Sequence, residues 1–205
     1  MSHNNPRPAA TASAVPNNRP SYLSFGLAWL LGYTAFALTY GDDPGLPLPA
    51  AVGPVLLLGG LLTGLVVTAV VAVRAQRGTR GAEAAVGIML AASWLIGFSA
   101  LFLIITALES ALHEVRVQTL LWPTGSGLVV GMIYLAGGVA YRDLVQYALG
   151  AWLAVTSSAA LLLDGAHLYW VLAIAGGGGY LVAAMCRVRQ DGPRRREEAP
   201  LSGLA

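Results

Sequence analysis

Four side chains in this sequence have the types needed to bind a metal ion or to respond to pH. Glu109 and His113 lie four residues apart, and Asp164 and His167 lie three apart. Carboxylates and imidazoles are ligands for zinc, and histidine titrates near neutral pH. Neither spacing is a specific zinc signature, so we favour a solvated polar rim and keep the metal or proton-sensing cluster as the alternative.

A second candidate site is a run of hydroxyl side chains inside an apolar segment: Thr156, Ser157 and Ser158. Small hydroxyl residues can bond to the preceding helical turn and allow close packing, which is the favoured interpretation. The alternative is a substrate path. No acidic, basic or histidine side chain accompanies the run at that depth, which disfavours ion coupling.

Glycines give two further predictions. Four-residue spacing puts two glycines on one helix face and lets a neighbouring backbone approach, so we predict helix packing at two pairs: Gly60 with Gly64, and Gly127 with Gly131. Each glycine in a row of four weakens a helix by about 1 kcal/mol relative to alanine in water. A hinge, a discontinuous helix or a tight crossing is therefore predicted at Gly176, Gly177, Gly178 and Gly179, which join the candidate substrate path.

A catalytic alternative rests on one serine and one histidine. Ser126 and His167 each stand near the start of an apolar segment, which superficially resembles the rhomboid intramembrane proteases, whose serine and histidine perform nucleophilic catalysis. The sequence departs from that family, because Thr124 stands where its Gly-x-Ser-Gly motif needs glycine and Trp170 follows the histidine where glycines are expected. We therefore predict no catalytic residue and no enzyme, with an intramembrane serine protease as a remote alternative.

The composition shows what must position these residues. The 205-residue chain is 56% hydrophobic and 11% charged, with a mean hydropathy of +0.65, whereas soluble domains carry roughly 25% charged residues. About 20 apolar residues cross a bilayer as a helix. Six such segments predict an all-α bundle of six transmembrane helices spanning residues 22–186: 22–40, 50–73, 84–108, 120–140, 144–163 and 167–186.

The segments between and around these helices are polar. We predict a disordered tail over residues 1–21, an arginine-rich tail over residues 187–205, and an amphipathic or interfacial helix over residues 108–118. Trp122 and Pro123 are a turn signal, so the regular part of the fourth membrane helix, within the apolar segment 120–140, is expected to begin after them.

The arginines predict the orientation. All twelve basic residues are arginine, and all but Arg116 fall in the tails or in the second and fourth loops. The positive-inside rule therefore predicts that both termini are cytoplasmic, in a multi-pass protein of a bacterial inner membrane.

Three stretches carry a family resemblance: Leu120-Leu121-Trp122-Pro123, Tyr134-Leu135-Ala136-Gly137-Gly138, and residues 142–152. This pattern resembles uncharacterised multi-helix integral membrane proteins of high-GC Gram-positive bacteria that are loosely labelled permease-like. The resemblance covers the C-terminal half best. It implies a membrane protein with a transport-related role, and it transfers no functional residue.

The function expected from the sequence is therefore transport-related, as a permease-like subunit. A membrane-embedded sensory or regulatory module is the alternative. We expect the lipid bilayer and either a homo-oligomer or a transporter partner subunit as partners, and we expect neither nucleic acid nor a cofactor. Transport predicts a cavity joined to the hydroxyl run, whereas a sensor predicts a dry bundle with its polar groups at the ends.

Overall fold

The computed structural model describes residues 18–41, 45–49, 51–76, 81–114 and 116–197, and all regular structure in these ranges is helical. This confirms the predicted all-α class. The helices are α1 (Arg19–Leu38), α2 (Val52–Gln76), α3 (Ala82–Leu112), α4 (Arg116–Ala140), α5 (Leu144–Ala160), α6 (Ala166–Val171), the π-helical turn η1 (Leu172–Gly177) and α7 (Gly178–Glu197).

Five helical stretches in the described chain are long and apolar enough to cross a membrane: α1, α2, α3, α4 and the continuous α6–η1–α7. The apolar helix α5 has 17 residues, so the segment predicted over residues 144–163 ends early. Leu161, Leu162 and Leu163 each bond to a carbonyl three residues back, which tightens the chain before Asp164 and Gly165. Gly165 then takes a left-handed φ of 62°, which glycine adopts without strain.

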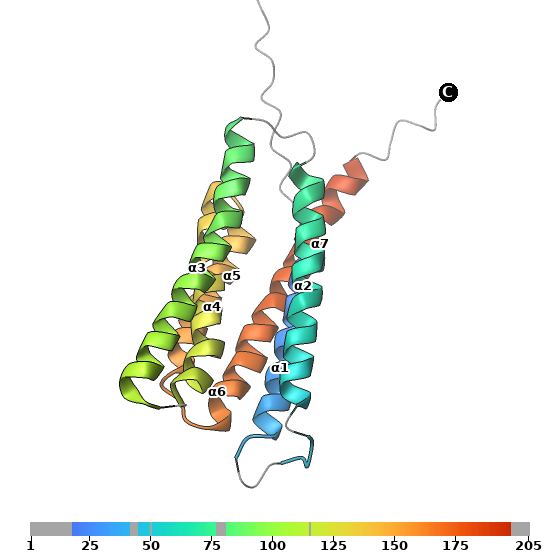
Figure 1. Ribbon diagram of the computed structural model, residues 1–205. Coiled ribbons are helices and arrows are strands. Elements are labelled where there is room, and N and C mark those ends of the chain that lie inside the picture. Colours follow the sequence, from blue (N-terminus) through green and yellow to red (C-terminus); the bar gives the residue numbers. More distant parts are fainter. Residues whose placement is uncertain (1–17, 42–44, 50, 77–80, 115, 198–205) are drawn as a thin grey trace, which may run out of the picture.

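Successive membrane helices run antiparallel, so α1 begins and α7 ends at the same end of the bundle (Figure 1). We call this the N/C end, which also holds the turn between α4 and α5. The opposite end holds the connections α1–α2, α3–α4 and α5–α6.

Two sequence predictions about the third connection are wrong. Residues 108–118 do not form one helix, because α3 continues to Leu112 and His113 ends it in a left-handed conformation, with φ 56°. The fourth helix begins at Arg116 and contains Pro123, which was expected to precede it. The apolar pattern alone could not locate this break, since both halves continue a helical periodicity.

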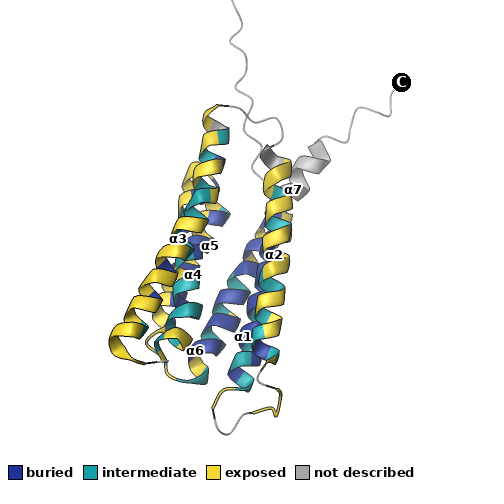
Figure 2. Cartoon of the chain, viewed as in Figure 1, coloured by how far each residue is buried: buried dark blue, intermediate teal, exposed yellow. Residues whose placement is uncertain are grey.

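The core forms around α1 and α6–η1–α7. About 56% of the apolar stretch of α1 is buried, against 6% for α2 and 11% for α3. Figure 2 shows this contrast between the buried central helices and the exposed α2 and α3. The substantial contacts of α2 are with α1, and those of α3 are with α4. The two peripheral helices are therefore held to different central helices.

The glycine run produces tight crossings on two sides of the last membrane helix. A β-carbon at Gly176 would lie 2.6 Å from the Trp29 ring of α1, and one at Gly179 would lie 2.6 Å from the Trp152 ring of α5. Between them the helix takes a π-helical turn, and Trp152 Nε1 donates a hydrogen bond to the Ala175 carbonyl, 2.7 Å away. Of the predicted possibilities, the described helix shows close crossings and an irregular turn.

Both predicted glycine pairs lie at helix crossings. Gly60 faces Ala28 and Gly64 faces Phe25, where α2 crosses α1. Gly127 faces Ser157, and Gly131 faces the Ala154 backbone of α5. Small residues at these positions bring the helix backbones close together.

Gly59 and Gly60 provide a matched test of this packing. A β-carbon at Gly60 would lie 2.6 Å from the Ala28 β-carbon, whereas one at Gly59 meets nothing within 4 Å. We expect Gly60→Ala to lower the free energy of unfolding by about 1–3 kcal/mol through overpacking, and Gly59→Ala to leave it unchanged or raised. Unfolding of both variants in mixed micelles measures the difference, and equal effects would show that this crossing does not set the α1–α2 distance.

Candidate binding site in a lateral groove

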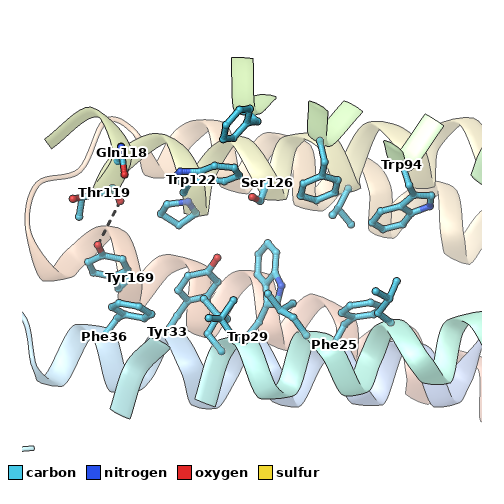
Figure 3. A pocket seen from close by; sticks show the side chains of 18 of the residues that line it. Phe25, Trp29, Tyr33, Phe36, Trp94, Gln118, Thr119, Trp122, Ser126 and Tyr169 are labelled. Carbon is cyan, nitrogen blue, oxygen red and sulfur yellow. Dashed lines mark hydrogen bonds between the residues drawn. The ribbon is translucent and has the colours of Figure 1, made fainter. Parts of the chain in front are cut away.

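A large apolar cavity lies between α2, which packs on α1, and α3, which packs on α4. Its volume is about 1090 Å³, its base is formed by α1, α4, α6 and α7, and its walls are α2 and α3. We call it the groove. Figure 3 shows side chains from the two sides facing each other across it. Aromatic residues dominate the lining: Phe25, Trp29, Tyr33, Phe36, Trp94, Phe98, Phe102, Trp122, Tyr169 and Tyr180.

One helix supplies the longest aromatic row. Phe25, Trp29, Tyr33 and Phe36 follow one another at spacings of three or four residues, which places them on one face of α1. Trp29 contacts Tyr33, and Tyr33 contacts Phe36. Tyr33 and Phe36 also contact Tyr169 of α6, at the opposite end of the bundle. The centroids of Trp29 and Tyr33 are 5.3 Å apart in an edge-on arrangement, and those of Phe36 and Tyr169 are 5.3 Å apart and stacked. Such pairs fix the shape of the base.

The groove opens sideways between α2 and α3. Leu58 on α2 and Leu95 and Leu103 on α3 line it and are 60%, 74% and 65% exposed. Since α2 and α3 make their substantial contacts elsewhere, none of the described helices closes the space between their rims. In a bilayer this opening faces hydrocarbon, so an apolar molecule can enter without crossing a polar surface.

A few polar groups line the groove where it reaches the opposite end of the bundle. Pro123 has no backbone N–H, so it cannot bond to the Thr119 carbonyl four residues back. The Tyr169 hydroxyl lies 3.5 Å from that carbonyl and donates to it, as Figure 3 shows. Gln118 and Thr119 also line the groove here. The proline thus leaves a carbonyl at the groove margin, where a tyrosine supports it.

A smaller cavity of about 410 Å³ adjoins the groove toward the N/C end. The two cavities share Phe25, Leu65, Trp94 and Leu95 in their linings. This second cavity, which we call the N/C-end cavity, is where polar side chains gather: Asn18, Ser21, Tyr22, Thr68, Tyr141 and Gln146.

A buried ion pair lies next to Gln146, one of the residues that line the N/C-end cavity. Asp143 precedes α5 and accepts a hydrogen bond from the Gln146 backbone N–H, 3.1 Å away, which caps the helix. Its second carboxylate oxygen pairs with Arg187 of α7, and the two side chains are only 2% and 10% exposed. Asn18 Nδ2 donates to Gln146 Oε1 at 3.3 Å, which adds α1 to the cluster.

The sequence reasoning missed this cluster. The sequence pattern puts Asp143 in the loop between two apolar segments and Arg187 in the arginine-rich tail, whereas α7 continues past Arg187 to Glu197. An acidic residue directly before a helix is a capping signal, which could have identified Asp143. The aromatic row on α1 is also visible in the sequence, in the spacing of Phe25, Trp29, Tyr33 and Phe36.

The four candidate metal-binding or pH-sensing residues, Glu109, His113, Asp164 and His167, lie at the opposite end of the bundle, where other side chains bond to both carboxylates. Arg116 pairs with Asp164 at 2.9 Å, and Gln118 donates to Glu109. His167 Nδ1 lies 3.3 Å from the Asp164 carbonyl, and His113 forms the cap of α3. In the described ranges, no three acidic, histidine or cysteine side chains are grouped so that they could hold a metal ion.

The predicted hydroxyl run and glycine run line neither cavity. Thr156 and Ser157 are buried, with Ser157 packed against Gly127 and fully inaccessible, and Ser158 is exposed. Ser126 lines the groove, whereas His167 lies on the surface, and no hydrogen bond joins the two in the part of the chain that the structure describes.

These features define an α-helical membrane protein with a lateral, aromatic-lined groove. Comparison of the chain with protein-family models, curated proteins and solved structures gave no match.

The two ion pairs differ in burial and allow a matched test. We expect Asp143→Asn to lower the free energy of unfolding by about 3–5 kcal/mol, because it leaves Arg187 buried without a counter-charge. Asp164→Asn removes a pair whose side chains are 61% and 92% exposed, so its effect should stay within about 1 kcal/mol. Unfolding in mixed micelles compares them, and similar small effects would contradict a structural role for the buried pair.

Proposed function

We propose that this protein holds an apolar molecule dissolved in the bilayer, and that it does so in a transport-related, permease-like role without changing the molecule chemically. The observation that carries the proposal is the groove, which is large, lined by aromatic rings and open between α2 and α3. Binding sites for small molecules are mostly apolar, with a few placed polar groups, and measure about 300–1000 Å³. The groove has this character and scale.

The proposed occupant is a hydrocarbon chain. A transmembrane helix about 10 Å wide and 30 Å long fills roughly 2400 Å³, more than twice the groove volume. A single chain is thinner, and the groove with its adjoining cavity runs along the bundle, from Thr119 to Asn18, as lipid chains run in a bilayer.

The sensory alternative has less support. Its proposed polar rim at the opposite end consists of acids that already pair with Arg116 and Gln118. A large cavity within the helices is not expected of a dry bundle. The transport hypothesis placed its cavity at Thr156, Ser157 and Ser158, and these residues line neither cavity, so the proposed binding site moves from the hydroxyl run to the groove.

We further propose that α5 crosses the membrane as the sixth span, with both termini in the cytoplasm of a bacterial cell and the protein in the inner membrane. Seventeen residues extend about 26 Å, and the following turn of Leu161, Leu162 and Leu163 lengthens the apolar stretch. The arginine distribution supports this orientation. A homo-oligomer or a transporter partner subunit remains the proposed partner.

A bulky side chain in the groove tests the binding proposal. Ser126→Phe places a ring in the groove, so we expect the apparent dissociation constant of a diacylglycerol, measured by native mass spectrometry in detergent, to rise at least about tenfold, or about 1.4 kcal/mol. Ser158→Phe adds the same ring on an exposed face of α5 and should change nothing. If Ser126→Phe binds every chain-bearing lipid as the unmodified protein does, the groove is not the binding site.

Cysteine labelling tests the sixth span. In a Cys186→Ser background, Ala140→Cys and Asp164→Cys put exposed thiols before and after α5. We expect a membrane-impermeant maleimide to label Asp164→Cys in intact cells and Ala140→Cys only after permeabilisation. Labelling of both thiols under the same condition would show that α5 does not cross.

A further inference from the structure

The N/C-end cavity differs from the groove in its polar lining. Hydroxyl and amide groups from α1, α2, α5 and the turn after α4 meet there, whereas the adjoining groove is lined mainly by rings and leucines. An amphiphile in the groove would therefore place its polar end in this cavity and its chain among the aromatic rings.

Three buried hydroxyls that line this cavity, those of Ser21, Tyr22 and Thr68, have no hydrogen-bond partner among the residues that the structure describes. In the helices of this chain, hydroxyl side chains commonly bond to the carbonyl four residues back: Ser24, Thr39, Thr63, Ser93 and Thr124 all do so. Ser21 Oγ and Thr68 Oγ1 are buried and make no such bond. Ser21 as a whole is only 3% exposed.

An unmet buried hydroxyl costs about 1–3 kcal/mol. Such groups persist where something else bonds to them or where function requires them. Ser21 and Thr68 come from different helices, α1 and α2, yet they line the same cavity. Asn18 and Gln146 bond to each other at 3.3 Å, and each amide keeps further donor and acceptor capacity. The cavity is therefore built to exchange hydrogen bonds with a guest.

The charge beside the cavity is already neutralised. Arg187 pairs with Asp143, and neither residue lines the cavity. The described polar lining is uncharged, so a phosphate or ammonium group would be buried there without a counter-ion, at a cost of several kcal/mol. A hydroxyl or an ester carbonyl carries no such cost.

We propose that the N/C-end cavity binds the uncharged, hydroxyl-bearing headgroup of a lipid, such as a diacylglycerol, whose chain lies in the groove. This inference rests on the proposed function. Ser21, Thr68 and the amides of Asn18 and Gln146 exchange hydrogen bonds with the headgroup, and the paired Arg187 excludes anionic lipids by offering no free positive charge.

The test compares three lipids with identical chains on the full-length protein in detergent, by native mass spectrometry. They are a diacylglycerol, its derivative with the free hydroxyl acetylated, and the corresponding phosphatidic acid. We expect the diacylglycerol to bind about tenfold more tightly than either of the others. Tighter binding of phosphatidic acid would overturn the uncharged site.

Matched variants assign the effect to the Ser21 and Thr68 hydroxyls. Thr68→Val and Ser21→Ala should each weaken diacylglycerol binding about threefold to tenfold and leave the acetylated lipid unaffected. Thr63→Val and Ser24→Ala remove hydroxyls that already bond within their helices and line neither cavity, so they should leave all three lipids unaffected.

The outcomes separate this inference from the proposed function. If the three lipids bind equally and Thr68→Val has no effect while Ser126→Phe still blocks binding, the headgroup site is wrong and the groove remains. If Ser126→Phe also has no effect, the groove proposal fails. Circular dichroism and unfolding of each variant confirm that it is folded before its affinity is compared.

Discussion

The close packing of the last membrane helix against its two neighbours determines the rest of this structure. Without β-carbons, Gly176 and Gly179 let Trp29 and Trp152 lie directly on the helix surface, from α1 on one side and α5 on the other. Four glycines would leave an isolated helix weak, and the π-helical turn shows the irregularity that results. The Trp152 indole bonds to the Ala175 carbonyl within that turn. Contacts with α1 and α5 therefore stabilise a segment whose own helix propensity is poor.

This central position of α6–η1–α7 explains the groove. The helix binds α1 on one side and α5 on the other, so α2 follows α1 and α3 follows α4 away from each other. Aromatic rings then fill the base but not the space between the rims. The interactions at the two ends keep the arrangement in place. Asp143 and Arg187 join α5 to α7 at the N/C end, and Tyr169 contacts α4 at the opposite end. A membrane interior offers no hydrophobic drive to close such a space, because lipid chains are as apolar as leucine.

Hydropathy and glycine spacing predicted the helical class, most of the helical segments and the residues at the α1–α2 and α4–α5 crossings. They could not predict which helices are neighbours, and this determines every cavity. Asp143 and Arg187 are 44 positions apart in the sequence and each has a reasonable place in a loop or tail, so their pairing depends on the tertiary fold. The break at His113 and the proline inside α4 were misjudged for a related reason: hydropathy does not reveal a left-handed residue or a helix that tolerates proline because another side chain supports the freed carbonyl.

The distribution of charge limits the chemistry that the bundle can support. The Asp143–Arg187 and Arg116–Asp164 ion pairs lie at opposite ends of the bundle, the first buried and the second exposed. The long cavity between them is lined by aromatic rings and a few neutral polar groups. Proton or ion coupling usually relies on ionisable groups within the membrane. Asp143 and Arg187 compensate one another, so they serve the structure by fixing α5 and α7 and present no net charge to the N/C-end cavity. A site that combines a neutral polar end with an aromatic channel open to lipid discriminates by hydrogen bonding and shape. That combination favours uncharged amphiphiles over ions, and it connects the absence of mid-membrane charge, which is evident in the sequence, to the kind of molecule that the fold can hold.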